Sequence, residues 1–130
     1  MTQSEKKLKL GRLTKRSEFL HVRDGIYKPS GGVVVQMRAN PAIGCEKKPE
    51  ISIRVGFTAT KRVGNAVIRN RAKRRLREVA RTLLPDHGLL GYDYVFIARD
   101  STLSRPYEQL LDDTQKALLS LSRKAQTVPI

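Results

Sequence analysis

Apolar side chains recur along the chain with two different spacings. Between Ala66 and Leu84 they lie three or four residues apart, which is the spacing of one face of an α-helix. The positions are Ile68, Ala72, Leu76, Val79 and Leu83. Between Ile51 and Thr58 apolar and polar residues alternate, as they do in a half-buried strand. The pattern therefore predicts an amphipathic helix over 66–84, which Pro85 ends, and a strand over 51–58.

Shorter patterns predict two further strands and two further helices. The β-branched run Val33–Met37 is typical of a strand, and so is Tyr94–Ala98. Residues 14–23 carry apolar side chains at helical spacing and predict a short first helix. A final helix is predicted from Ser104, with Pro106 in its first turn.

The connection between the first two predicted strands suggests how they pair. Residues 40–50 contain two prolines and a glycine, so they are predicted to form an exposed loop. Strands 33–37 and 51–58, joined by this loop, are expected to pair antiparallel. A chain of 130 residues can close one hydrophobic core but not two. We therefore expect a single domain over residues 1–130, with flexible ends at 1–9 and 123–130.

The composition indicates where in the cell the protein works and which kinds of catalytic or metal site it lacks. The single cysteine, Cys45, cannot form an intramolecular disulfide, and neither a signal peptide nor an apolar run of about 18 residues is visible. These features favour a soluble cytoplasmic protein with no membrane partner. The chain has only two histidines, no paired metal ligands and no glycine-rich phosphate motif. We expect no catalytic residue, no bound cofactor and no metal site in the protein itself.

Charge is concentrated in two segments. The net charge is +14, and residues 1–23 hold seven basic and two acidic side chains, while residues 61–81 hold nine basic and one acidic. Charge that serves only solubility is normally spread along a chain and mixed in sign. Positive charge crowded onto one helix repels itself unless a polyanion neutralises it. Arginine binds phosphate oxygens in bidentate fashion, so nucleic acid is the expected partner.

Two other uses of a basic helix fit less well. A solvated helix face usually carries both positive and negative side chains. Here Glu78 is the one acidic residue between Arg69 and Arg81. A membrane-bound or calmodulin-bound helix needs a broad apolar face, whereas the stripe here is narrow, lacks Trp and Phe, and is needed by the strands. The helix is therefore predicted to pack on a sheet and to present its cations to a polyanion, with nucleic acid as the first candidate.

A gapped motif gives these segments a family resemblance. The motif comprises Val55-Gly56-Phe57, Lys61-Arg62-Val63-Gly64-Asn65-Ala66-Val67, Arg69-Asn70-Arg71, Lys73-Arg74 and Arg77-Glu78. It resembles the signature of the bacterial ribonuclease P protein subunit, and the likeness covers essentially residues 10–122. The resemblance implies an α/β (α+β) two-layer sandwich like the second domain of ribosomal protein S5. That fold has a mixed sheet of about four strands, a basic central helix and a left-handed βαβ crossover, although the right-handed form is the general rule.

The resemblance also implies a function. Proteins of this family bind the ribonuclease P catalytic RNA and the 5′ leader of precursor tRNA, and the ribonucleoprotein cleaves the precursor to free the mature 5′ end. The RNA supplies the active site with Mg²⁺, so the enzyme is an endoribonuclease whose protein subunit carries no catalytic residue. A structural ribosomal RNA-binding protein of similar fold is the alternative that composition leaves open. A DNA-binding regulator fits poorly, because the basic helix follows a strand and a loop.

Site residues are carried over position by position. The expected RNA contacts are Lys61, Arg62, Asn65, Arg69, Asn70, Arg71, Lys73, Arg74, Arg75 and Arg77. The expected contacts with the precursor-tRNA leader are Phe19, Phe57, Thr58, Thr60, Asn70, Lys73 and Arg77. Of these, the two phenylalanines and the two threonines are expected to line a cleft between the first helix and the sheet, where unpaired bases stack. An ordinary core position is the alternative for Phe57. For Asn65, together with Gly64, the alternative is a turn that leads the chain into the helix without touching RNA.

Two positions depart from the family pattern. Many relatives carry a second aromatic residue four positions after the first-helix Phe and another in the first strand. This chain has Arg23 at the first position and Gln36 or Met37 at the second. We therefore expect weaker stacking in the cleft and a larger contribution of charge to leader binding.

Overall fold

Five strands form one mixed sheet in the computed structural model, which describes residues 10–40 and 53–127. The strands are β1 (Leu10–Arg12), β2 (Ile26–Ser30), β3 (Val33–Ala39), β4 (Ile53–Thr58) and β5 (Tyr92–Ala98). The helices are α1 (Arg16–Arg23), α2 (Ala66–His87) and α3 (Tyr107–Thr127). Within the sheet the strand order is β1-β4-β5-β3-β2. The mixed α/β fold is confirmed, with five strands in place of about four.

The strand neighbours differ from the prediction. β4 pairs in parallel with β1 and with β5, while β3 pairs antiparallel with β5 and with β2. The predicted pairing of residues 33–37 with 51–58 is therefore wrong, because β5 lies between β3 and β4. The two strands do run in opposite directions. Chain proximity favoured the direct pair, but β5 offers a partner to both strands at once. The predicted loop 40–50 lies outside the described residues except for Asn40.

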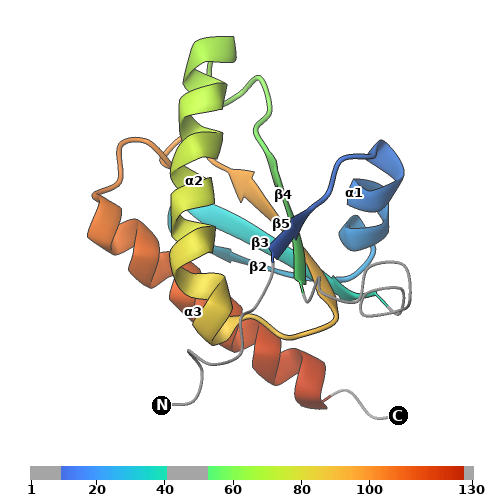
Figure 1. The fold of residues 1–130 in the computed structure, drawn as a ribbon. Helices are drawn as coiled ribbons and strands as arrows, with labels where there is room; N and C mark the ends of the chain where they lie inside the picture. Colours follow the sequence, from blue (N-terminus) through green and yellow to red (C-terminus); the bar gives the residue numbers. More distant parts are fainter. Residues whose placement is uncertain (1–9, 41–52, 128–130) are drawn as a thin grey trace.

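The helices cover the two faces of the sheet unequally. α2 and α3 pack on one face, where they bury a continuous core with side chains of β3, β4 and β5. Representative fully buried members are Met37, Ile53, Leu76, Tyr94, Phe96 and Leu118. α1 lies on the opposite face, over a smaller cluster of Leu13, Val22 and Val95. Figure 1 shows α1 on the other side of the sheet from α2 and α3. One face is thus fully covered, and the other only in part.

Helix α2 begins as the sequence predicts and ends later. The side-chain oxygen of Asn65 accepts a hydrogen bond from the amide of Ile68 at 3.0 Å, which caps the first turn. Gly64 precedes it with φ 149°, a value that favours glycine. Pro85 does not end the helix, which continues to His87. A proline in the last turn removes only one helical bond, and Gly88 closes that turn by donating to the carbonyl of Leu84 at 2.8 Å.

The ends of the chain also differ in detail. α3 begins at Tyr107 rather than Ser104, so Pro106 lies just before the helix, where its carbonyl accepts from the amide of Leu110 at 3.0 Å. The helix runs to Thr127 and so includes the first residues of the tail 123–130. Strands β1 and β2 were not predicted, because three and five residues are too few for alternation to stand out.

Candidate nucleic-acid interface

The N-terminal part of α2 projects from the body of the protein. None of residues 66–71 is buried, and the first buried side chain of the helix is Ala72. In Figure 1 this end of α2 (green) extends past the sheet. Its first turn contains no acidic residue, and the amide dipoles at a helix N-terminus add positive potential. This end of the helix is therefore an exposed site for anions.

Several cations of α2 lie along one side of the helix, beside the core face. Arg74, Arg77 and Arg81 follow one another at intervals of three or four residues, with the polar Asn70 one turn before Arg74 and Lys73 next to Arg74. We call these residues the cationic stripe: Asn70, Lys73, Arg74, Arg77 and Arg81. Among the described residues, the only ion pair of the stripe joins Arg81 to Glu78 at 3.2 Å. Both side chains are exposed, so this pair neutralises little of the charge.

The loop before α2 adds two exposed cations, Lys61 and Arg62. Arg62 and Thr60 line a pocket of about 290 Å³ together with Arg99 and Asp100, at the C-terminal ends of the parallel strands β4 and β5. Such strand ends commonly receive ligands in α/β proteins. Arg99 has no counterpart in the sequence motif and is a further candidate RNA contact that the sequence did not single out.

Three of the predicted RNA-binding residues also form hydrogen bonds within the protein. Asn65 caps α2, as the alternative interpretation of this residue predicted. Arg69 donates to the carbonyl of Gly64 at 3.4 Å. Arg75 donates to the carbonyls of Thr102 and Leu103 at 2.8 and 2.7 Å, and its guanidinium lies over the ring of Tyr107. The last contacts attach α2 to the segment before α3, so Arg75 is held away from the cationic stripe.

Phe19 lies on the face of the sheet that carries α1. A Cβ atom on Gly56 would approach the Phe19 ring to 2.5 Å, so glycine is needed for the ring to lie against β4. Phe19 is half-buried and packs on the cluster that contains Leu13 and Val95. Side chains alternate along a strand, so Thr58 points to the same face as Gly56 and is also half-buried. Phe19 and Thr58 therefore share an accessible surface.

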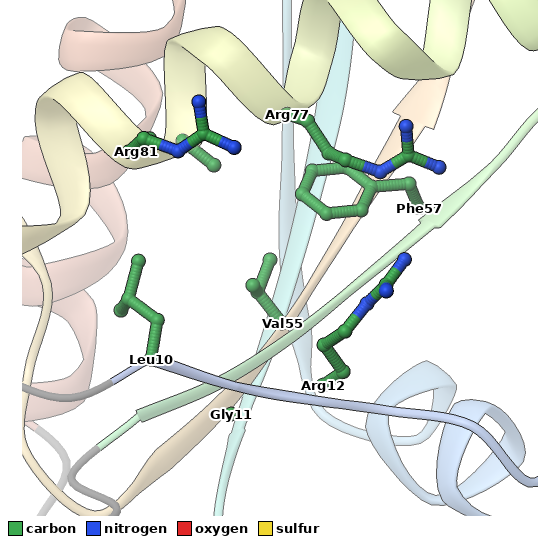
Figure 2. Close-up of a pocket in the computed structure, with 8 residues that line it drawn as sticks. Leu10, Gly11, Arg12, Val55, Phe57, Arg77 and Arg81 are labelled. Carbon is green, nitrogen blue, oxygen red and sulfur yellow. The ribbon is translucent and has the colours of Figure 1, made fainter.

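Phe57 faces the other way and does not line a cleft with Phe19. Its ring packs against Phe96 in the larger core, with ring centroids 5.7 Å apart. The guanidinium carbon of Arg77 lies 5.8 Å from the ring centre. Figure 2 shows the Arg77 side chain running from α2 to the Phe57 ring. The predicted single cleft containing both phenylalanines is therefore wrong, because successive residues of β4 project to opposite faces. The predicted leader contacts are divided, with Phe19 and Thr58 on one face and Phe57 and Arg77 on the other.

The two candidates for the missing strand aromatic, Gln36 and Met37, lie on opposite faces of the sheet. Gln36 pairs with Val95 across β3 and β5 and is half-buried on the α1 face, while Met37 is fully buried under α2 and α3. Gln36 therefore lies on the same face as Phe19, where it offers an amide instead of a ring.

An ion-pair network anchors α1 to the sheet. Arg54 on β4 donates to both carboxylate oxygens of Asp93 on β5, at 2.9 and 2.7 Å, and to Glu18 on α1 at 2.9 Å. Asp93 is fully buried and accepts a further bond from Asn40 at 2.9 Å. The hydrogen bond to Asp93 raises the pKa of Arg54, so this arginine stays charged. Because Glu18 precedes Phe19, the network also sets where the Phe19 ring lies.

Glu18 makes the folded state sensitive to acid. Burial raises the pKa of this carboxylate, but the amides of Lys15 and Thr14 and the charge of Arg54 outweigh burial and lower the pKa below 4.5. A lowered pKa adds stability above about pH 4.5, and that stability disappears as the pH falls through the folded-state value.

Glu18→Gln is therefore expected to lower the free energy of unfolding by about 1–2 kcal/mol at pH 7. The difference from wild type should shrink below about pH 4.5. Urea unfolding at a series of pH values measures it. A difference that stayed constant with pH would mean that the charge of Glu18 contributes nothing.

The described residues also bear on metal binding and membrane insertion. Within 10–40 and 53–127, no three His, Cys, Asp or Glu side chains are grouped so that they could hold a metal ion. In the same part of the chain, none of the helices is long and apolar enough to span a membrane.

Comparison with known proteins settles which family has this arrangement of basic helix and mixed sheet. A family model described as Ribonuclease P matches residues 8–122. The chain belongs to this family. The ribonuclease P protein component of Ruegeria pomeroyi is 53% identical over 110 residues, covering 84% of each chain. That of Caulobacter vibrioides is 47% identical over 122 residues, covering 94% of this chain and 78% of the relative.

Solved structures agree with this assignment. An RNase P protein mutant from Staphylococcus aureus superposes with a TM-score of 0.69 at 25% identity, covering 93% of both chains. The RNase P protein from Thermotoga maritima has the same fold, with a TM-score of 0.67 over 84% of this chain and 96% of the other. The chain is thus a protein subunit of ribonuclease P, an endoribonuclease and ribonucleoprotein of tRNA processing. The ribosomal alternative is not favoured, and RNA is the partner.

Proposed function

We propose that this protein binds the catalytic RNA of ribonuclease P through α2 and the loop before it. The contacts are Lys61, Arg62, Asn65, Arg69, Asn70, Arg71, Lys73 and Arg74, with Arg75 contributing mainly by fixing α2 to α3. The observation that carries the proposal is the exposed N-terminal half of α2, where cations are crowded and acids are absent from the first turn. Phosphate oxygens are the chemistry that balances such a surface.

The 5′ leader of precursor tRNA would lie on the α1 face. Phe19 and Thr58 provide an accessible ring and hydroxyl, and unpaired bases stack well on aromatic side chains. From there the leader would pass Thr60 and reach Asn70 and Lys73 on the cationic stripe. With one ring in place of several, we expect charge to provide much of the leader affinity.

In this proposal the RNA carries out the chemistry. The catalytic RNA would hold the Mg²⁺ ions that activate water and stabilise the leaving oxygen. The protein would bring the leader and the RNA together and reduce the repulsion between their phosphates. It would act in the cytoplasm, where precursor tRNA is processed.

Reconstitution tests the proposal. The full-length protein is added to transcribed ribonuclease P RNA and precursor tRNA at low Mg²⁺ concentration, and cleavage is measured over time. Stimulation over RNA alone is expected, together with an affinity for the catalytic RNA that falls steeply as salt rises. If the protein bound ribosomal RNA fragments equally well and did not stimulate cleavage, the ribosomal alternative would replace this proposal.

Phe19→Ala should selectively weaken the binding of precursor tRNA to the reconstituted enzyme. Loss of one stacked base is worth about 1–3 kcal/mol, so the affinity for precursor tRNA should fall by that amount while the affinity for mature tRNA is unchanged. Leu20→Ala, at an exposed neighbouring position of α1, is the matched control and should change neither affinity. Equal losses for precursor and mature tRNA would mean that Phe19 only supports the fold.

A further inference from the structure

A second groove lies on the face of the sheet opposite Phe19. It has a volume of about 250 Å³ and is enclosed by β1, β4 and α2. Its principal lining residues are Leu10, Arg12, Val55, Phe57, Arg77 and Arg81. Leu10 and Arg12 are brought here by the parallel register of β1, which sets Arg12 beside Val55. Sequence patterns could not place Arg12 in this groove, because β1 is only three residues long.

The groove combines an apolar floor with three guanidinium groups. Leu10, Val55 and Phe57 form the floor, and Figure 2 shows Arg12 extending from β1 toward Phe57 while Arg77 and Arg81 approach from α2. Of the residues that the structure describes, no acidic side chain lines the groove. Among the described residues, neither Arg12 nor Arg77 forms an ion pair, and the pair of Arg81 with Glu78 is exposed to solvent. The positive charge at this groove is therefore left for an external anion.

Arg77 is held in place before any ligand arrives. Its guanidinium lies over the Phe57 ring, and its Nε is buried with no hydrogen-bond partner among the described residues. An unsatisfied buried donor is costly, so such a group commonly marks a site where a partner is missing. A guanidinium stacked on a ring is also pre-oriented, which lowers the entropy lost when it binds a phosphate.

We propose that this groove binds one unpaired nucleotide of RNA, with its phosphate held by Arg12, Arg77 and Arg81 and its base against Leu10 and the Phe57 ring. The volume of this groove, about 250 Å³, lies just below the usual range of small-molecule sites, which begins at about 300 Å³. The groove therefore suits a single nucleotide better than an RNA double helix. The site is distinct from the Phe19 surface, because the sheet separates the two. The proposal rests on the RNA-binding function above and adds a second point of base recognition.

Nuclear magnetic resonance of the full-length protein tests the site directly. The probes are a five-residue oligoadenylate, inorganic phosphate and tetraglutamate, each titrated into protein labelled at the arginine side chains and at Phe57. The oligonucleotide should shift the Arg77 Nε–Hε signal and the Phe57 ring signals in a saturable way, and these shifts should be lost in Arg12→Gln/Arg81→Gln. Shifts confined to arginines outside the groove, such as Arg62 and Arg71, would overturn the proposal. So would equal effects of phosphate or tetraglutamate, since those probes contain no base.

The nucleotide could come from the catalytic RNA or from the leader, and the holoenzyme distinguishes the two. Arg12→Gln/Arg81→Gln should lower the affinity for the catalytic RNA roughly tenfold in the first case. In the second case it should lower the preference for precursor over mature tRNA by a similar factor. Lys116→Gln/Arg123→Gln removes the same charge from the exposed surface of α3 and is the matched control.

The outcomes also separate this proposal from the function on which it rests. If the groove variant matched the α3 control in both measurements while the wild-type protein bound the catalytic RNA, the groove proposal alone would fail. If the wild-type protein did not bind the catalytic RNA, the proposed function itself would fail.

Discussion

Replacing Lys61, Arg62, Arg71 and Arg74 by glutamine is expected to lower the affinity for the catalytic RNA by about two to three orders of magnitude at about 0.15 M salt. All four side chains are exposed, and glutamine is as good a helix former as arginine or lysine, so the fold should be retained. Each lost phosphate contact removes about 0.7–0.9 from the slope of log affinity against log salt concentration. Filter binding or fluorescence titration at several salt concentrations measures both quantities.

A charge-matched pair of double variants separates location from total charge. Arg71→Gln/Arg74→Gln removes two cations from α2, and Lys116→Gln/Arg123→Gln removes two from the exposed side of α3. The α2 variant should lose at least about tenfold in affinity, while the α3 variant loses little. Equal losses would show that net charge alone attracts the RNA, and would contradict an interface on α2.

Asp93→Ala is expected to lower the free energy of unfolding by about 3–5 kcal/mol. The carboxylate is fully buried and accepts two hydrogen bonds from Arg54 and one from Asn40. Removing it leaves the half-buried guanidinium of Arg54 without its main partner. Because a domain of this size has only about 5–15 kcal/mol of net stability, the effect should be large in urea or thermal unfolding.

A surface carboxylate on α3 provides the control for Asp93. Asp112 pairs with Lys116 at 3.0 Å, but both side chains are mostly exposed. Asp112→Ala should therefore cost no more than about 0.5 kcal/mol. A similar loss for the two variants would mean that the network around Arg54 contributes no more than a surface ion pair.

The sequence predicted the elements that have a strong repeat. The long basic helix was placed within a few residues, because its apolar positions recur over about four turns and Asn65 is a good cap. Strand β4 was found from its alternation of apolar and polar residues, and β3 and β5 from their runs of β-branched and aromatic residues. Strands β1 and β2 are too short to show a period, and the end of α2 was missed because Pro85 is tolerated in a last turn.

The site was predicted unevenly. The exposed cations of α2 and its preceding loop lie where the motif put them, because charge that faces away from an apolar stripe must face solvent. Arg12 and Arg99 were not recognised, since each reaches its pocket only through pairing of strands that are distant in sequence. Arg75 was assigned to RNA, and only the folded chain shows its bonds to the carbonyls of Thr102 and Leu103.

The amino-acid order alone determined the three helices and the strands β3, β4 and β5 to within a few residues, the excess of cations on one helix, and RNA as the partner. Only tertiary structure decided that β5 enters between β3 and β4, and that Phe19 and Phe57 point to opposite faces of the sheet. The reason is physical. Helical period and charge are properties of neighbouring residues, whereas strand order depends on which distant partners bury the most apolar surface together.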